Sequence, residues 1–425
     1  MTIYSILILL FLLIVLLISG VPITAALGFC ALAGAFLLDI APDFLAKRMV
    51  ASLQSDALMS IPFFILVGNI MMESGISKKI IIFLDSFLGR MRGGLNYAAV
   101  AACAFFSALA GPAPLTVIAV GSVLYEQMTA LGYPKERSAG LFTAAGSLGS
   151  IIPPSVIMIV YSSITKIPIK DLFTAGMGIG IILTVVYMII CLYIGKKENL
   201  RRNIEKFVFR DFVKSFISLL PAAFIPIIIA GGIYFKILTP LQAGAASSLY
   251  ALLLGFFVYK TLNKEKFVRA FFNCAKNSAM ILFIIIGANL FSVIFINSGL
   301  DKYLQNTVSV LDLSPLSFSL FAGFIVIAIG TVLDGAAICV FLAPAFYAIA
   351  QSLGIDGVHF AMIMCVGAVL GSMTPPVAVS IFAAKTFTKL SAGAIAKGQM
   401  PFFIGFLSVY ILVIIFPIIS RFLSK

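Results

Sequence analysis

Charged residues are scarce in this sequence. Asp, Glu, Lys and Arg make up 11% of its 425 residues, whereas hydrophobic residues make up 62% and the mean hydropathy is +1.16. A soluble domain needs a much larger polar fraction to cover its core. The composition therefore excludes a soluble protein and indicates one that crosses the bilayer many times.

The residue types that enzymes and metal centres need are also scarce. A single histidine cannot supply a metal cluster, and no P-loop or GxSxG motif is present. The cysteines lie within apolar runs and lack CxxC spacing, so we expect them to be buried core residues: Cys30, Cys103, Cys191, Cys274, Cys339 and Cys365. These absences argue against a soluble enzyme and against a pump driven by nucleotide hydrolysis.

The N-terminus carries no early charge, because the first charged residue is Asp39. A cleavable signal peptide needs a basic segment before its apolar stretch. We therefore expect the first apolar run to be retained as a membrane span.

Apolar runs of about 20 residues recur along the whole chain, and only helices or closed barrels can cross a bilayer. The runs are continuous rather than alternating, so we predict an all-α polytopic membrane protein. The expected spans are 3–20, 22–40, 59–75, 95–130, 139–165, 172–194, 217–235, 240–259, 271–297, 316–350, 358–384 and 399–420. Two of these runs, 95–130 and 316–350, are too long for one crossing and should each hold two helical pieces.

Much of the net charge of +13 lies in two loops, 195–214 and 259–276. Two expected spans separate these loops, which places both on the same side of the membrane. The positive-inside rule makes that side cytoplasmic. Attraction to anionic lipid explains the remaining basic character better than binding to nucleic acid, since exposed aromatic residues do not alternate with the cations.

The chain repeats itself at an offset of 222 residues. Segment 131–155 aligns without a gap on 353–377, and both contain Gly-Ser-x-x-Pro-Pro in register. Farther upstream, 63–76 resembles 283–300. We expect N-terminal spans at 1–54, a first repeat at 55–194, a connector with two spans and both basic loops at 195–276, and a second repeat at 277–425. Paired repeats are typical of secondary transporters, whose two halves meet at a site near the membrane midplane.

Pro153 and Pro154 should open the helix that contains them, because proline lacks a backbone N–H and disfavours helical geometry in the residue before it. Unsatisfied carbonyls are costly in lipid. Together with the hydroxyls of Ser147, Ser150 and Ser155, the freed carbonyls could bind Na+, and the following half-helix could attract an anion. The alternative is a proline kink satisfied by neighbouring helices.

The second copy of this segment keeps Gly371, Ser372, Pro375 and Pro376 and adds Thr374. Val377 takes the place of Ser155. We therefore expect two related sites with different chemistry.

A further helix break precedes each Pro-Pro segment, at Gly111-Pro112 and around Asp334. An ionised carboxylate within an apolar run needs a cation, a proton or several hydrogen-bond donors. Asp334 is thus a candidate Na+ ligand or proton carrier, or else a helix cap beside Gly335. Asn69 and Asn289 occupy paired positions and could contact substrate or make ordinary interhelical hydrogen bonds.

Four stretches of the chain together resemble a known family: 20–23, 60–71, 148–155 and 353–382. They are similar to the large membrane (M) subunit of tripartite ATP-independent periplasmic (TRAP) transporters, and the resemblance covers nearly the whole chain. It implies a sodium-driven importer with two inverted repeats, helical hairpins, discontinuous helices and an elevator-type moving domain.

The resemblance also implies two protein partners in a bacterial inner membrane. They are a small four-helix (Q) subunit, expected here as a separate chain, and a periplasmic solute-binding (P) protein. The implied substrates are organic acid anions such as C4-dicarboxylates or sialic acid. Na+ is the implied coupling ion, and no cofactor is expected.

The family's ion sites carry over onto the two breaks of each repeat. The implied Na+ ligands are Ser107, Gly111, Thr116, Gly146, Ser147, Gly149, Ser150, Pro153, Pro154, Ser155, Gly330, Thr331, Asp334, Gly367, Gly371, Ser372, Thr374, Pro375 and Pro376. The candidate substrate contacts are Asn69, Asn289, Ser155 and Thr374. One departure is Ala110-Gly111-Pro112, where the family often has Ser-Gly-Ser, so Ser107, Thr116 or a carbonyl must replace the missing hydroxyl.

Two other functions fit parts of the pattern. A self-sufficient sodium–dicarboxylate symporter of the divalent-anion type has similar repeats and needs no partner proteins. An intramembrane enzyme could use Asp334, but it would require a second acid or a metal cluster at the same depth, and the sequence offers neither.

Overall fold

The computed structural model describes residues 8–9, 11–13, 15–16, 19–200, 209–297, 313–375 and 378–423. Within these residues the secondary structure is helical, without strands. The helices are α2 Ile23–Leu37, α3 Pro42–Leu53, α4 Asp56–Met59, α5 Ile61–Glu73, α6 Ile76–Leu88, α7 Gly94–Ala110, α8 Ala113–Ala130, α9 Lys135–Gly146, η1 Ser147–Ser150, α10 Val156–Thr165, α11 Ile169–Lys197, α12 Phe209–Pro226, η2 Ile227–Gly231, α13 Gly232–Tyr234, α14 Pro240–Leu253, η3 Leu254–Val258, α15 Lys264–Asn297, α17 Pro315–Gly330, α18 Gly335–Ser352, α19 Gly357–Ser372, α20 Val379–Lys385, α21 Ala392–Ile415 and α22 Pro417–Ser420.

The two over-long apolar runs each divide into two helices, as predicted. Run 95–130 contains α7 and α8, and run 316–350 contains α17 and α18. Seven helical stretches in the described ranges are long and apolar enough to cross a membrane. Half of the first expected span, 3–20, lies outside the described residues.

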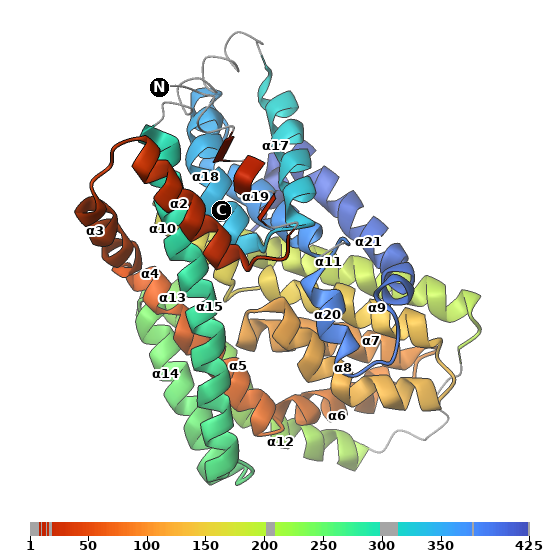
Figure 1. Cartoon of the computed structure of the whole chain (residues 1–425). Coiled ribbons are helices and arrows are strands. Elements are labelled where there is room, and N and C mark those ends of the chain that lie inside the picture. Colours follow the sequence, from red (N-terminus) through yellow and green to blue (C-terminus); the bar gives the residue numbers. More distant parts are fainter. Residues whose placement is uncertain are drawn as a thin grey trace.

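The helices form two groups (Figure 1). In the first, α15 packs along α2 and α5, and α14 packs on α5. The second contains α7 to α11 and α17 to α21, which include every helix that flanks a predicted break. Helices α10 and α18 lie at the boundary, because α10 contacts α4 and α18 contacts α15.

Helices α9 and α21 pack with their backbones in contact. A Cβ atom added to Gly398 of α21 would collide with the Glu136 carbonyl oxygen, and one added to Gly140 of α9 would collide with the Gln399 backbone. Arg137 donates a hydrogen bond from Nη1 to the Gly398 carbonyl oxygen at 3.0 Å. Small residues allow such close approach between helices in a membrane protein, where lipid supplies little hydrophobic driving force.

The two repeats run in opposite directions. Helices α9 and α19 occupy matching positions in the repeats, yet α9 begins beside the start of α21, through Arg137 and Gly398. Helix α19 begins beside the chain that follows the end of α21, where His359 Nδ1 and Ser420 Oγ are 3.1 Å apart. Helix α21 has 24 residues and is about 36 Å long. The matched helices therefore start at opposite ends of one long helix, which makes the repeats inverted.

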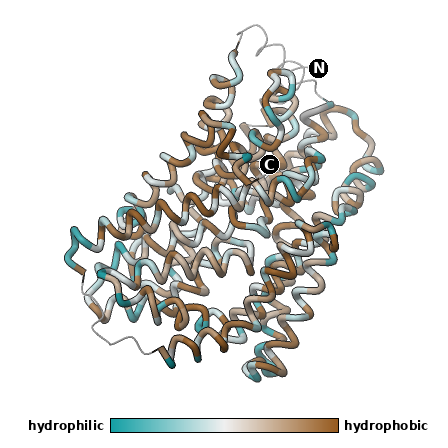
Figure 2. Tube along the Cα trace, turned by 180° about the vertical axis from the view of Figure 1, so that it is seen from behind, coloured by the Kyte–Doolittle hydropathy of each residue, from teal (hydrophilic) through white to brown (hydrophobic). Residues whose placement is uncertain are grey.

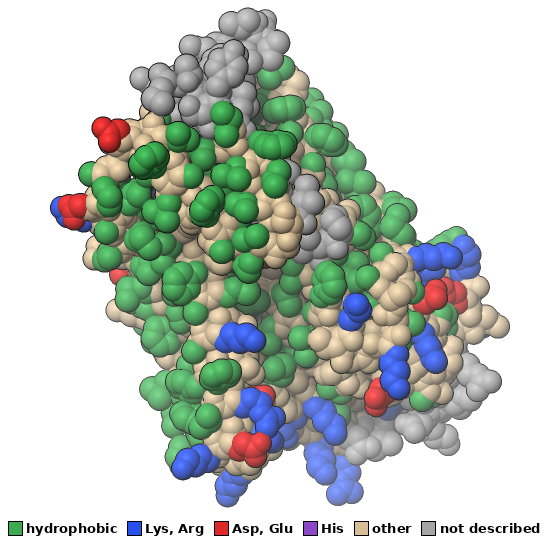
Figure 3. Space-filling view, in the orientation of Figure 1, with side chains coloured by type: hydrophobic (Ala, Val, Ile, Leu, Met, Phe, Trp, Pro, Cys, Tyr) green, Lys and Arg blue, Asp and Glu red, His purple; other side chains and the backbone are tan. Residues whose placement is uncertain are grey.

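Polar residues concentrate at the helix ends and loops, whereas the helix bodies are hydrophobic (Figure 2). Lys and Arg side chains gather along the lower edge in Figure 3, over the starts of α12 and α15. The basic loops 195–214 and 259–276 lead into these two helices. The described ends of the two loops lie on the same side of the molecule (Figure 1), as predicted, and the positive-inside rule predicts that this side is cytoplasmic.

Helices α3 and α6 were not among the expected spans. Both are amphipathic, and charged residues interrupt their apolar pattern. Helix α6 packs on α7 and α12, and Lys79 donates from Nζ to Ser218 Oγ at 2.9 Å. The charged residues keep these helices below the hydropathy of a span, while the apolar residues still bind them to the bundle.

The glycine contact between α9 and α21 predicts a difference between two substitutions on α21. Gly398→Ala should lower the free energy of unfolding by about 1–3 kcal/mol, because the added methyl group collides with the Glu136 backbone. Gly393→Ala is the matched control, since no atom lies within 4 Å of its added Cβ. Thermal unfolding in detergent measures both variants. Equal stability of the two variants would contradict the proposed role of the contact.

Candidate functional site

The Pro-Pro segment of the first repeat interrupts a helix, as predicted. Helix α9 ends at Gly146, one 3₁₀ turn covers Ser147–Ser150, and the chain is then non-helical up to Ser155, after which α10 begins. The Pro153–Pro154 peptide bond within this interruption is cis. The interruption exposes backbone groups that an intact helix would satisfy.

Serine hydroxyls satisfy part of the exposed backbone. Ser155 Oγ donates to the Ser150 carbonyl oxygen at 2.5 Å and accepts from the Met158 backbone N–H at 3.4 Å. Ser147 Oγ donates to the Ala144 carbonyl oxygen at 2.6 Å. Ser155 thus spans the interruption and caps the half-helix that follows it.

The first interruption of this repeat lies between Ala110 of α7 and Ala113 of α8. Gly111 has φ +74° and ψ −65°, a conformation that other residues rarely adopt. A Cβ atom at Gly111 would lie 2.7 Å from the Pro154 carbonyl oxygen. Glycine is therefore required here both for the turn and for the approach of the second interruption.

The two interruptions of the first repeat lie against each other. The Ala113 backbone N–H donates to Ser150 Oγ at 3.4 Å. A Cβ atom at Gly149 would lie 2.7 Å from Thr116 Oγ1 and 3.1 Å from the Gly111 carbonyl oxygen. Thr116 thus lies beside the break, and its replacement of the missing family hydroxyl stays a prediction. This arrangement gathers carbonyl and hydroxyl oxygens from two helix pairs in one place.

Two other candidates of this repeat lie about one turn from the junction. Ser107 is buried in α7 and donates from Oγ to the Cys103 carbonyl oxygen at 2.5 Å. Gly146 packs against Val117 of α8. Gly146 thus allows α8 and α9 to approach closely, whereas Ser107 bonds within its own helix.

The second repeat brings its two interruptions together in the same way. Gly330 is the last residue of α17, and Gly371 lies at the end of α19. A Cβ atom at Gly330 would lie 2.8 Å from Gly371 Cα, and one at Gly371 would lie 2.8 Å from the Ile327 carbonyl oxygen. The helices therefore cross with their backbones touching at the point where both end. Gly367, by contrast, lies against Tyr410 of α21.

Asp334 caps α18. Its Oδ2 atom accepts from the Ala336 backbone N–H at 3.1 Å, and the side chain is partly buried. Thr331, in the same interruption, donates from Oγ1 to the Ala328 carbonyl oxygen at 2.8 Å. The helix-cap interpretation of Asp334 is thus confirmed, and its role as an ion ligand stays a prediction.

The Pro-Pro segment of the second repeat begins where α19 ends. Ser372 Oγ donates to the Val369 carbonyl oxygen at 2.8 Å, and Thr374 Oγ1 donates to the Leu370 carbonyl oxygen at 3.1 Å. Pro376 lies outside the described residues. This repeat therefore uses hydroxyls at the helix end where the first repeat uses Ser155 across the break.

The hydroxyl candidates other than Ser150, which accepts from the Ala113 N–H, share one property, which is that each donates its proton to a backbone carbonyl. They are Ser107, Thr116, Ser147, Ser155, Thr331, Ser372 and Thr374. A hydroxyl has two lone pairs besides its proton, so a hydroxyl that donates in this way can still offer oxygen to a cation. The arrangement is chemically suited to a small hard cation.

Gln399 is a site neighbour that the sequence alone did not reveal. This buried α21 side chain donates from Nε2 to the Met373 carbonyl oxygen at 3.0 Å, directly after α19 ends. Its Oε1 atom is buried without a hydrogen-bond partner among the described residues. The repeat register pairs Gln399 with Met177, so the internal alignment gave no signal for it.

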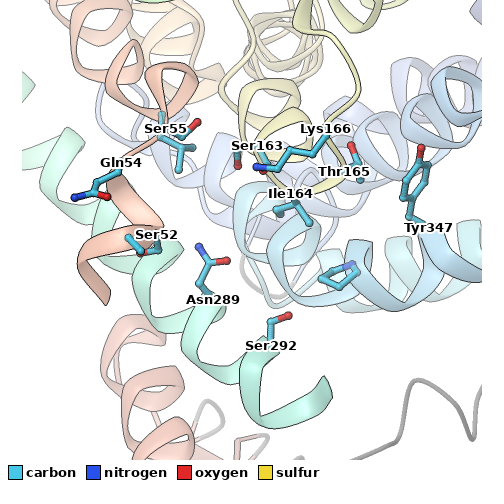
Figure 4. Close-up of a pocket in the computed structure, with 13 residues that line it drawn as sticks. Ser52, Gln54, Ser55, Ser163, Ile164, Thr165, Lys166, Asn289, Ser292 and Tyr347 are labelled. Atoms are coloured by element: carbon cyan, nitrogen blue, oxygen red, sulfur yellow. The ribbon is translucent and has the colours of Figure 1, made fainter. Parts of the chain in front are cut away.

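The two asparagine candidates have different environments. Asn69 is buried in α5 and donates from Nδ2 to the Ile65 carbonyl oxygen at 2.8 Å. Asn289 of α15 instead lines a cavity of about 490 Å³, together with Ser292 of the same helix (Figure 4). Only Asn289 thus faces space that a small molecule could occupy.

Comparison with known proteins identifies relatives along nearly the whole chain. The sequence model described as "Tripartite ATP-independent periplasmic transporter, DctM component" matches residues 10–419. The chain is 34% identical to the C4-dicarboxylate TRAP transporter large permease protein DctM of Pseudomonas aeruginosa, over 90% of each chain, and 32% identical to that of Rhodobacter capsulatus, over 96% of each. It is also 31% identical to the isethionate TRAP transporter permease protein DctMQ of Oleidesulfovibrio alaskensis, matching 96% of this chain and 64% of that protein.

Solved transporter structures share the fold. The YdaH transporter of Alcanivorax borkumensis superposes with a TM-score of 0.59 at 16% identity, over 96% of this chain and 97% of that one. MtrF of Neisseria gonorrhoeae superposes with a TM-score of 0.58 at 15% identity, over 89% and 83% of the two chains. These similarities place the helical architecture among membrane transporters.

The bridge made by Ser155 predicts a local loss of stability when its hydroxyl is removed. Ser155→Ala should lower the free energy of unfolding by about 1–2 kcal/mol, because the Ser150 carbonyl and the α10 cap lose their partner. Ser155→Thr should restore most of this loss. Thermal unfolding in detergent measures both variants.

Ser408→Ala is the control for this prediction. Ser408 Oγ also donates to a backbone carbonyl, that of Ile404, but within an uninterrupted helix. A loss for Ser155→Ala no larger than that for Ser408→Ala would show that Ser155 does not stabilise the break.

Proposed function

Because the chain belongs to the family of the DctM component of tripartite ATP-independent periplasmic transporters, we propose that it imports a small organic acid anion by coupling its movement to inward Na+ flow. As a large permease of this family, the chain is a multi-pass membrane transporter subunit and not an enzyme.

The proposal rests on one observation, which is that two helix interruptions lie against each other within each repeat. Gly111 lies against Pro154 in the first repeat, and Gly330 lies against Gly371 in the second. Non-helical backbone at membrane depth is tolerated where it is buried in protein or lines a site. In secondary transporters such interrupted helices form the ion and substrate sites near the midplane.

Oxygen chemistry at the interruptions supports Na+ as the coupling ion. The first junction combines the Gly111 and Pro154 carbonyls with the Thr116 hydroxyl. The second repeat offers the hydroxyls of Ser372 and Thr374 at the end of α19, and the carboxylate of Asp334 lies four residues after Gly330, which contacts Gly371. Asp334 uses one oxygen for the cap and can offer the other to a cation, which would lower the cost of its charge in the membrane.

An elevator-type movement fits the division of the helices into two groups. The interrupted helices all belong to the second group, while α2, α5, α14 and α15 belong to the first. In the proposed mechanism the second group moves against the first and carries both junctions with it. Helices α10 and α18 are then the sliding surfaces, because they face α4 and α15.

Two partner proteins complete the proposed transporter in a bacterial inner membrane. One is the small four-helix subunit, which the relative named DctMQ carries fused to its permease. The other is a periplasmic binding protein that delivers the anion. The cargo is a C4-dicarboxylate, sialic acid or a similar anion, and relatives named for C4-dicarboxylate and isethionate support this class.

Reconstitution tests the proposed coupling. In proteoliposomes that contain the chain and its small subunit, with the binding protein outside, an inward Na+ gradient should raise uptake of the bound anion at least about fivefold over an equal K+ gradient. Equal uptake in Na+ and K+ would overturn the coupling. Uptake by this chain alone would support a self-sufficient symporter instead.

The Asp334→Asn substitution distinguishes the role of Asp334 as a helix cap from its proposed role as an ion ligand. Asparagine caps helices about as well as aspartate, so thermal stability should change by less than about 0.5 kcal/mol. The Na+ concentration for half-maximal uptake should rise roughly 10- to 100-fold, because an interaction with a charged group is worth about 1.5–3 kcal/mol. Unchanged Na+ dependence with unchanged stability would leave Asp334 as a structural cap only.

A further inference from the structure

Two cavities meet between the two groups of helices. The first, of about 490 Å³, is lined by the α3–α4 segment, the end of α10, α15 and α18 (Figure 4). The second, of about 520 Å³, extends from the end of α10 toward α11, α13 and α14. Both are lined by Ser55, Ser163 and Lys166, so they adjoin. We call the joined space the outer vestibule.

The vestibule lies on the side opposite the cytoplasmic basic loops. Helix α11 runs from Ile169, beside the vestibule, to Lys197, where loop 195–214 begins. Its 29 residues span about 44 Å, more than the thickness of a bilayer core. The start of α11 must therefore face the periplasm when its end faces the cytoplasm.

The lining of the vestibule is basic. Lys166, Lys170 and Lys236 line it, and none of its described lining residues is Asp or Glu. The nearest acids in sequence, Asp56 and Asp171, do not line it. The positive-inside rule disfavours lysines on this side of the membrane. Their presence around a hollow, without acidic lining, points to an anionic ligand.

Lys166 occupies the centre of this arrangement. It follows the last residue of α10, is exposed and lines both cavities. Its Nζ atom donates to the Ser163 carbonyl oxygen at 2.8 Å, and Figure 4 shows the side chain lying over Ser163. An ammonium group has three donors, so two remain for a ligand. Lys166 thus places a positive charge beside Ser163 and keeps two N–H donors for a ligand.

Neutral polar groups line the same space from other sides (Figure 4). Asn289 and Ser292 project from α15, Gln54 comes from the α3–α4 segment, and Tyr347 comes from α18. Helix α10 connects Lys166 to the Pro-Pro break, and its ten residues span about 15 Å. Lys166 therefore lies about one α10 length from the first junction.

We propose that the outer vestibule binds the small organic anion before the anion reaches the helix junctions, with Lys166, Lys170 and Lys236 as its cationic lining and Asn289 as a neutral contact. The inference rests on the proposed function, because it takes an anion as the cargo. It adds a periplasmic binding site that is separate from the junctions.

A cysteine probe tests the vestibule without transport. Ser55 lines both cavities and makes no side-chain cap hydrogen bond, so Ser55→Cys introduces a thiol at little structural cost. The six native cysteines are buried and free, which keeps background labelling low. The purified chain is labelled with a negatively charged and a positively charged methanethiosulfonate reagent of similar size. No binding protein is present, so docking of that protein cannot produce a charge preference.

The anionic reagent should react faster than the cationic one with the thiol that Ser55→Cys introduces. The ratio of the two rates should fall about tenfold when Lys166, Lys170 and Lys236 are all changed to Gln. Succinate should slow labelling in the Ser55→Cys parent and not in the triple Gln variant. Changing Lys260, Lys264 and Lys266 to Gln, at the cytoplasmic end, is the matched control and should leave the ratio unchanged.

Uptake measurements separate failure of this inference from failure of the proposed function. If the parent transports, the triple Gln variant should need at least about tenfold more anion-loaded binding protein for half-maximal uptake, and the triple Arg variant should resemble the parent. Equal reactivity toward the two reagents, or unchanged uptake in the triple Gln variant, would overturn the proposal that the vestibule binds the anion. Absence of transport by the parent would overturn the proposed function. The labelling result would still show whether the vestibule binds an anion.

Discussion

The structure depends on one constraint, which is that a helix interrupted inside a membrane must satisfy its backbone groups without bulk water. Each repeat meets this constraint by bringing two interruptions together and by using side-chain hydroxyls on the freed carbonyls. Ser155 binds the Ser150 carbonyl, and Gln399 binds the Met373 carbonyl. The same oxygens that need partners in the absence of an ion are those that could coordinate one. A cation bound at the junctions would therefore act on the same atoms that stabilise the interrupted helices.

Close packing makes these junctions possible. Gly111, Gly149, Gly330 and Gly371 each occupy a place where a methyl group would meet backbone or a neighbouring oxygen. Interiors are packed too tightly to absorb such a change without movement. The glycines consequently position carbonyl groups, and the position of a carbonyl determines whether it can reach a cation. A substitution at one of these glycines would therefore change both the helix packing and the positions of the carbonyl oxygens.

The sequence predicts the interruptions well because their cause is local. Proline removes a backbone donor and restricts its neighbour, so Pro153 and Pro154 mark a break whatever surrounds them. The internal repeat then identifies the second junction, and the charge of the loops predicts the membrane orientation. These features predict the helix pairs and the two junctions, whereas the resemblance to the family supplied the inversion of the repeats and the full set of candidate ligands.

The remaining features depend on contacts between distant parts of the chain. Gln399 lies in an apolar run without a matching residue in the other repeat, and only folding places it beside Met373. Asn69 and Asn289 look equivalent in sequence, yet one bonds within its own helix and the other faces a cavity. Helix α6 escaped prediction because its charged residues lower its hydropathy although it packs on α12. Tertiary packing decides each case.

Helix α21 also sets a mechanical condition for the proposed mechanism. It holds the start of α9, the helix that leads to the first junction, through Gly398 and the end of α19 through Gln399, so a helix that reaches each junction is attached to one continuous rod. If that rod shifts, the two junctions must be displaced together and by the same amount. In that mechanism, an ion could not leave one junction independently of whether the other junction has its ligand bound. Tight coupling would arise from the stiffness of a helix rather than from a separate gate.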